Sequence, residues 1–205
     1  MKKLVFVAVF MTVICLAGAG LAGANDAKVF TADDFKYIPD FSVSPDKDFK
    51  KAFICPGYGD VIRGFGKPES ETEDALGFSL EYEFGEINLR LDGGKPDTLW
   101  LKITEEELEG PRGIKVGYPY EKVLGAFKSN LEAFPKGKFQ ADLYSEGKQP
   151  APAYTGIAFM DSKTGKVTSL YYWHGNRRGS IAISVNFIIE DGVVASIMWR
   201  IDKRA

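Results

Sequence analysis

The sequence is poor in the residues that build catalytic and metal centres. Its 205 residues include a single histidine and two cysteines. Most general-base, catalytic-triad and zinc sites need at least one well-placed imidazole, and zinc sites often need several ligands of this kind. No group of residues along the chain has the spacing of a catalytic or metal site. We therefore expect a non-enzymatic protein that carries neither a cofactor nor a metal ion.

The chain also lacks a strong charge of either sign. It has 26 basic and 28 acidic residues, a net charge of −2, and 45% apolar residues. This composition is ordinary for a globular protein and excludes disorder, collagen, a coiled coil and a small disulfide-stapled fold. Mild acidity disfavours nucleic acid and anionic membranes as partners, because both select a basic patch.

The N-terminus has the pattern of a secretory signal peptide. Two lysines precede an apolar stretch at 4–17, and small residues at 22–24 then form a cleavage site. The stretch is short for a membrane span. We therefore predict a signal peptide at 1–24 and an exported chain, periplasmic or extracellular, that spans no membrane after cleavage. An uncleaved amino-terminal anchor is the alternative.

The two cysteines support no disulfide in the exported chain. Cys15 lies inside the apolar stretch, and the bulky Ile14 before it argues against a lipid-attachment site. Removal of the signal peptide leaves Cys55 as a lone thiol, which cannot form an internal disulfide. We expect Cys55 to be a buried small hydrophobe, so that the fold depends on its apolar core.

Two blocks with the same order of elements follow a polar amino-terminal extension at 25–50. Repeat 1 covers 51–104, repeat 2 covers 113–205, and an acidic linker at 105–112 joins them. Each block begins with a short segment of helical spacing and continues with runs that alternate apolar and polar residues. Repeat 2 also contains an insertion at about 132–166, with two further strand-like runs.

The alternating runs predict two antiparallel meanders. They lie at 78–84, 86–91 and 98–103 in repeat 1, and at 167–173, 180–189 and 193–201 in repeat 2. The helix that precedes each meander would cover its apolar face. The predicted fold class is therefore α+β, built from tandem helix-plus-antiparallel-meander repeats whose helices pack on one face of the sheet.

The helix of repeat 2 carries a motif that is similar to a known group. Gly-Ile-Lys-Val-Gly at 113–117 introduces a predicted helix at 120–131, which begins with Tyr-Glu-Lys-Val-Leu. This helix, followed by a meander and doubled along the chain, resembles the β-lactamase-inhibitory-protein-like and small outer-membrane assembly lipoprotein families. The resemblance covers most of 51–203. It implies a module that grips a partner protein with its open sheet face or its loops, and it assigns no site residue.

Strand alternation indicates which side chains lie on the open face. If the alternate apolar residues of 98–103 face the helices, Trp100 points away from them, and the same reasoning turns Arg200 outward. Tyr171 and Trp173 join this face if their neighbours point inward.

A loop that contains Arg177 and Arg178 follows these aromatic residues. It is either an ordinary hairpin tip or a clamp for an acidic group. Aromatic and arginine side chains on a solvated sheet are typical of protein interfaces. The candidate binding residues are therefore Trp100, Tyr171, Trp173, Arg177, Arg178 and Arg200.

Three functions follow from these observations. The first is a non-enzymatic binding protein, expected to be a monomer, which engages another protein in the cell envelope or outside the cell through the open sheet face. The second is a small-ligand binder with a pocket between the repeats or under the insertion. The third is an enzyme that uses Cys55 and His174, although no family signature surrounds either residue. The first requires that neither the insertion nor the extension covers the open face.

Overall fold

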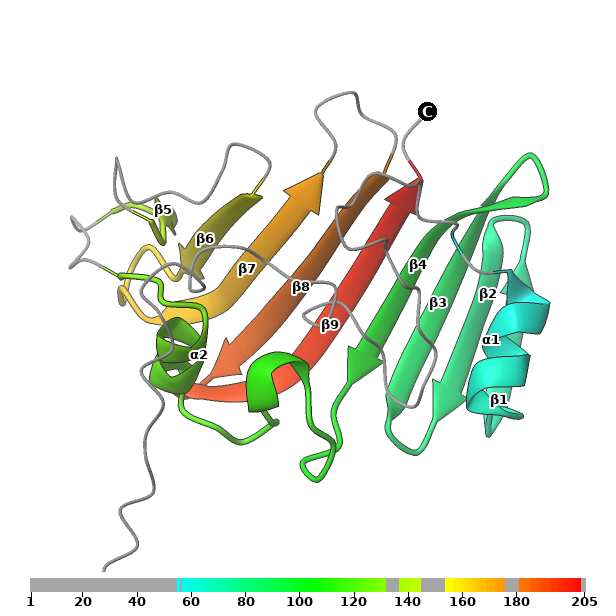
Figure 1. The fold of residues 1–205 in the computed structure, drawn as a ribbon, viewed down its shortest axis with the longest axis horizontal. Helices are drawn as coiled ribbons and strands as arrows, with labels where there is room; N and C mark the ends of the chain where they lie inside the picture. Colours follow the sequence, from blue (N-terminus) through cyan, green and yellow to red (C-terminus); the bar gives the residue numbers. More distant parts are fainter. Residues whose placement is uncertain (1–54, 56, 132–136, 145–153, 176–180, 204–205) are drawn as a thin grey trace, which may run out of the picture.

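The computed structural model describes residues 55, 57–131, 137–144, 154–175 and 181–203. These residues form two α-helices, α1 (Tyr58–Phe65) and α2 (Tyr120–Ala126), a short 3₁₀ helix η3 (Pro111–Gly113) and nine strands (Figure 1). The strands are β1 (Ser70–Asp74), β2 (Gly77–Tyr82), β3 (Gly85–Asp92), β4 (Lys95–Ile103), β5 (Gln140–Asp142), β6 (Tyr154–Met160), β7 (Val167–Gly175), β8 (Ile181–Glu190) and β9 (Val193–Lys203). The predicted signal peptide and the extension at 25–50 lie outside the described residues.

All nine strands belong to one antiparallel sheet, with the order β1-β2-β3-β4-β9-β8-β7-β6-β5. The strands β1–β4 follow α1 along the chain, and the strands β5–β9 follow α2 (Figure 1). The two halves join where β4 pairs with β9, and Leu101 lies opposite Trp199 at this junction. Because backbone pairing continues through the junction, the chain folds around a single sheet.

One row of side chains forms the centre of the hydrophobic core. Leu80, Ile87, Leu101, Trp199, Val185 and Tyr172 lie opposite one another on six neighbouring strands, and all are fully buried. A large apolar side chain contributes about 1.5–3 kcal/mol when it is fully buried. The alternation of the sequence therefore assigns one face of the sheet to the core across both halves.

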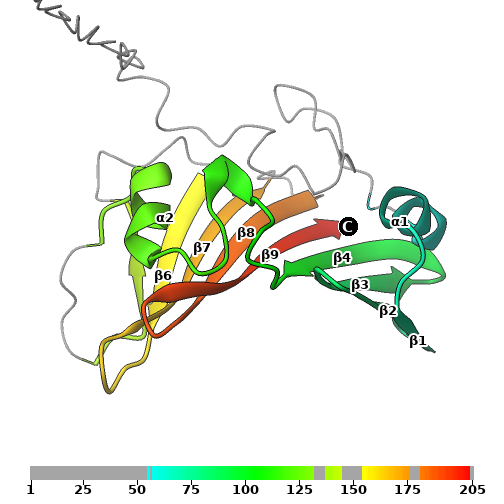
Figure 2. The same ribbon diagram turned by 90° about the horizontal axis from the view of Figure 1, so that it is seen from below.

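Both helices lie on the core side of the sheet (Figure 2). On α1, Val61 is fully buried and the Phe65 ring packs against the Phe84 ring, with 5.6 Å between their centres. On the α2 side, the Phe127 ring stacks on the Tyr172 ring of β7 with 4.1 Å between centres. Each helix thus covers one end of the core row and is held there by aromatic contacts.

A residue from the connecting segment holds the C-terminal end of α2. The Arg112 guanidinium lies 4.4 Å from the centre of the Phe127 ring, and its Nη1 donates a 2.8 Å hydrogen bond to the carbonyl oxygen of Ala126. A cation at this end of a helix stabilises the carbonyl groups that the helix leaves without partners. Arg112 has a left-handed backbone conformation, with φ 56° and ψ 31°.

A buried polar contact lies below α2. The Tyr172 hydroxyl and the Ser129 hydroxyl are 2.7 Å apart, and Ser129 also donates to the carbonyl oxygen of Leu124. Burial raises the pKa of the Tyr172 hydroxyl far above its ordinary value, so the group stays protonated. The contact fixes the segment after α2 to the centre of β7.

The predicted α+β class is wrong, because the described residues form a mainly β structure. The nine-stranded sheet carries only two short helices, α1 with eight residues and α2 with seven. A helix of seven residues is about 10 Å long, whereas nine strands spaced about 4.8 Å apart span about 40 Å. The helices therefore cannot form a layer over the sheet.

The helix expected at 120–131 is shorter because its chain direction changes early. Lys128 has a left-handed φ of 48°, and the carbonyl oxygen of Ala126 is taken by Arg112 instead of a continuing turn. The two predicted meanders are joined in one continuous sheet. The boundaries of repeat 1 and repeat 2 stay predictions from the sequence.

Candidate binding face

The face of the sheet opposite the helices is the candidate site, and we call it the open face. In the described ranges, the helices and η3 lie on the core side, and no element packs on the open face (Figure 2). Its side chains come from the alternate positions of the strands, because successive residues of a strand point to opposite faces. We also found no described helix long and apolar enough to cross a membrane.

The central row of the open face brings three predicted binding residues together. Trp100 of β4 lies opposite Arg200 of β9, Arg200 lies opposite Ser184 of β8, and Ser184 lies opposite Trp173 of β7. On the other side, Trp100 lies opposite Asn88 of β3. All of these side chains except Ser184 are half-buried. The row places two tryptophans and an arginine on neighbouring strands without requiring any rearrangement of the sheet.

Arg200 is held from two sides. Its guanidinium carbon lies 5.3 Å from the centre of the Trp100 ring, and its Nε donates a 2.8 Å hydrogen bond to Oδ1 of Asp202. The Asp202 side chain is 8% exposed and that of Arg200 is 43% exposed. An ion pair that is partly shielded from water and a cation over a ring both restrict the guanidinium. Since this hydrogen bond uses Nε, it leaves the two terminal nitrogens of the guanidinium available to other acceptors.

The half of the open face on β6–β9 is largely apolar. Tyr171 lies opposite Ile157 of β6 and Asn186 of β8, and Asn186 lies opposite Met198 of β9. A further row brings Phe159 and Ile188 to the two sides of Ser169, whose hydroxyl donates a 2.7 Å hydrogen bond to the Asn186 side-chain oxygen. The half-buried apolar and aromatic side chains of this half are Ile157, Phe159, Tyr171, Trp173, Ile188 and Met198.

The half of the open face on β1–β4 is polar and contains a hollow of about 190 Å³ beside Trp100. Residues of β1–β4 and of the β1–β2 turn line it, and those used below are Asp74, Gly77, Ser79, Asn88, Arg90 and Trp100. Gly77 lies opposite Arg90 on β3 and contributes only backbone to the lining. A cavity of about 150 Å³ accommodates a benzene ring, so this hollow has room for one side chain of a partner.

The structure allows only some of the predicted binding residues to be placed. Trp100, Tyr171, Trp173 and Arg200 all lie on the open face, whereas Arg177 and Arg178 lie outside the described residues. Sequence reasoning missed Asp202 and the hollow at Gly77. Asp202 could have been found, because it stands two positions after Arg200 and therefore shares its face. The hollow depends on pairing between strands, which local patterns do not specify.

The two residues of the catalytic alternative, Cys55 and His174, lie in the described part of the chain. Cys55 is 5% exposed and belongs to the hydrophobic core, and His174 stands near the end of β7. Within these residues, no group of three or more His, Cys, Asp or Glu side chains is arranged to hold a metal ion.

Comparisons of the chain with protein-family models, with curated proteins and with solved structures gave no match. The resemblance to β-lactamase-inhibitory-protein-like and outer-membrane assembly families therefore stays a prediction.

Proposed function

We propose that this chain is an exported, non-enzymatic protein that binds another protein through the open face. The observation that carries the proposal is the central row, in which Trp100, Arg200 and Trp173 lie half-buried on a face that no described element covers. Trp, Tyr, Met and Arg are enriched at protein interfaces, where rigid rings exclude water over a large area.

The dimensions of the sheet agree with such a role. Nine strands at about 4.8 Å spacing give a width of about 40 Å, and three rows of side chains add about 14 Å along the strands. With side-chain reach at the margins, this area approaches the roughly 800 Å² that each partner buries in a standard interface. The apolar half on β6–β9 would supply the dehydrated centre, and the polar half on β1–β4 would supply hydrogen bonds.

Export is supported by the predicted signal peptide at 1–24. We expect the mature chain to begin at Asn25, and intact-mass measurement of protein purified with a C-terminal tag tests this. A mass that includes the first 24 residues would favour the uncleaved anchor.

Quantitative capture tests the binding function. The C-terminally tagged chain is immobilised, exposed to envelope and extracellular extracts, and the retained proteins are quantified by mass spectrometry. We expect at least one protein to be retained and its apparent affinity to fall about thirtyfold in Trp100→Ala, the scale of an interface hot spot.

Phe139→Ala is the matched control, because Phe139 is an aromatic residue that is 63% exposed and precedes β5 outside the open-face rows. Equal retention by the wild type, Trp100→Ala and Trp173→Ala, with unchanged unfolding midpoints, would contradict binding through this face.

A further inference from the structure

We infer that the partner presents an acidic segment, and that the hollow beside Trp100 receives one of its carboxylate side chains with Arg90 as the ion-pair partner. The inference rests on the proposed binding function and adds the chemistry of the partner. Its basis is the arrangement of the open face, where basic side chains with hydrogen-bonding capacity left surround Trp100 and the nearby carboxylates are held by hydrogen bonds within the chain.

Three basic side chains surround Trp100. Arg200 stands opposite it on β9 and Lys102 stands two residues further along β4. Arg90 lies on β3, two residues after the residue opposite Trp100. In the part of the chain that the structure describes, the side chains of Arg90 and Lys102 form no hydrogen bond or ion pair, and only their backbones are engaged in strand pairing. Arg200 uses only its Nε toward Asp202. Several side-chain N–H donors therefore lie around the Trp100 ring and have no acceptor within the described residues.

The acidic groups of the same region are engaged within the chain. Asp74 Oδ1 accepts hydrogen bonds from the backbone N–H groups of Leu76 at 2.7 Å and Gly77 at 3.0 Å. Glu86 Oε1 accepts from the Asn88 amide at 2.8 Å and from the Ser79 hydroxyl at 3.1 Å. These contacts hold the carboxylates against their own strands, so they do not occupy the donors around Trp100.

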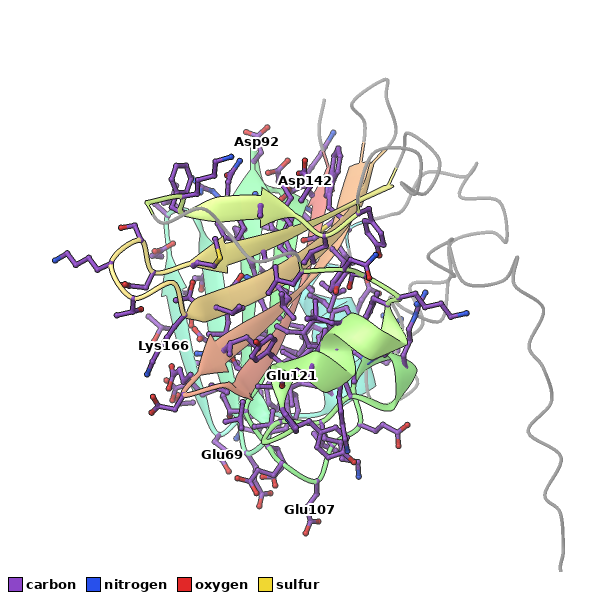
Figure 3. The ribbon with its side chains drawn as sticks, turned by 90° about the vertical axis from the view of Figure 1, so that its left-hand side faces the viewer. Glu69, Asp92, Glu107, Glu121, Asp142 and Lys166 are labelled. Carbon is purple, nitrogen blue, oxygen red and sulfur yellow. The ribbon has the colours of Figure 1, made fainter. Side chains whose placement is uncertain are left out.

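Other acidic residues lie at the ends of the strands. Figure 3 shows Glu69 and Glu107 at one end of the sheet and Asp92 at the opposite end, away from the middle of the face. Glu71, on the core side of β1, accepts a 2.8 Å hydrogen bond from the Tyr58 hydroxyl. The centre of the open face therefore presents basic donors inside an acidic margin, which complements a partner with carboxylates on a projecting segment.

The residues that line the hollow could hold one carboxylate side chain of the partner. Its floor is the bare backbone of Gly77, Arg90 lies directly opposite on β3, and the Trp100 ring forms an apolar wall. A Glu or Asp side chain could pack its methylene groups against the ring and direct its carboxylate to the Arg90 fork. An arginine can donate two parallel hydrogen bonds to a carboxylate, which a lysine cannot. Arg90 is exposed, so the Trp100 ring would shield one side of that pair from water and strengthen it on that side only.

Titration of the full chain with model peptides tests the inference. The probe is a peptide of alternating Glu and Gly with blocked ends, and the control peptide replaces every Glu with Gln. Binding is followed by NMR through the arginine Nε–H and tryptophan indole signals of the isotope-labelled protein. We expect the acidic peptide to shift the Arg90, Arg200 and Trp100 signals and the Gln peptide to leave them in place. The affinity should fall about tenfold in Arg90→Gln, the scale of one lost charge-assisted contact.

Arg63→Gln provides the matched protein control. Arg63 lies on α1 on the core side of the sheet, its side chain is 78% exposed, and it pairs with Asp60 at 3.2 Å. This variant should bind the acidic peptide like the wild type. If Arg63→Gln and Arg90→Gln weaken binding of the acidic peptide equally, the attraction is a general effect of positive charge. This result would overturn the role of Arg90 in the hollow.

Other outcomes separate this inference from the proposed function. Shifts of the same size with the Gln peptide would overturn the requirement for a carboxylate. If N-acetylglutamate alone binds as tightly as the peptide, the natural ligand is a small carboxylate. This result would overturn the inference that the carboxylate belongs to a segment of a protein partner. If no probe binds while Trp100→Ala still abolishes capture of a protein, the inference of an acidic partner segment is wrong and the proposed binding face stands. If capture is also unaffected, both proposals fail.

Discussion

Gly77 gives the sharpest test of how the open face is built. A Cβ atom added at this position would lie 1.9 Å from the carbonyl oxygen of Leu89, 2.9 Å from its carbonyl carbon and 3.0 Å from the Cα of Arg90. All three contacts are to the backbone of β3, which is paired on both sides with β2 and β4. The backbone φ of Gly77 is also +149°, a conformation that residues with a side chain rarely adopt.

We expect Gly77→Ala to lower the free energy of unfolding by about 3 kcal/mol or more, because neither strand can move away without breaking pairing in the sheet. For a chain of this size, that loss corresponds to a fall in Tm of about 6–12 °C. Gly93→Ala is the matched control, since Gly93 has a φ of +56° but no atom within 4 Å of an added Cβ. Gly93→Ala should lower the free energy of unfolding by only about 1–2 kcal/mol.

Urea and thermal unfolding, followed by circular dichroism, measure both variants against the wild type. A Gly77→Ala protein that is as stable as Gly93→Ala would refute the close approach of β2 to β3. A second comparison is Gly85→Ala, where the added Cβ would lie 2.0 Å from the carbonyl oxygen of Lys102. It should destabilise the fold to a similar extent, yet it lies outside the lining of the hollow.

Three further predictions concern the core and one loop. Tyr172→Phe should lower the free energy of unfolding by about 1 kcal/mol in urea titrations, because Ser129 keeps its hydrogen bond to Leu124. Arg112→Ala should cost about 1–2 kcal/mol in the same assay and speed amide hydrogen exchange in α2, since the helix end loses both a donor and the ring contact. Hydrogen bonds from Thr164 and Lys163 lower the pKa of Asp161 below its ordinary value, so the 161–166 loop is stabilised above pH about 4 and loses that contribution as pH falls through the lowered pKa. The protection factor of the Gly165 amide, which is the NMR exchange rate corrected for the pH dependence of intrinsic exchange, should fall on acidification in the wild type and not in Asp161→Asn.

Alternation along the chain was enough to predict the strands that contain large apolar residues. The runs at 78–84, 86–91 and 98–103 correspond to β2, β3 and β4 with small shifts of their ends. In contrast, β1 escaped prediction because all five residues of Ser-Glu-Thr-Glu-Asp are exposed. An edge strand of this kind is held by backbone pairing with one neighbour, and its acidic side chains oppose further pairing at the edge. No hydrophobic period marks such a strand.

Contacts between distant segments decided the features that sequence patterns did not specify. The C-terminal end of α2 depends on Arg112, which stands 14 residues before the carbonyl group that it binds. The fold class depends on pairing between β4 and β9, whose partners Trp100 and Arg200 are far apart in the chain. Two alternating runs can each form their own sheet or share one, and their local sequences are compatible with both. The expected α+β class was wrong because the two helices are short beside a nine-stranded sheet.

Small residues on the open face indicate that its large side chains are held in place before any partner arrives. Ser184 is 3% exposed although it belongs to the solvent side of β8, and its cross-strand neighbours are Trp173 and Arg200. Ser169, 8% exposed, lies in the same way between Phe159 and Ile188. Large neighbours can bury a serine on an open sheet only by lying over it, and this position restricts their own rotamers. Side chains that are already ordered lose less conformational entropy on binding, so this alternation of small and large residues favours affinity for a partner without adding a contact.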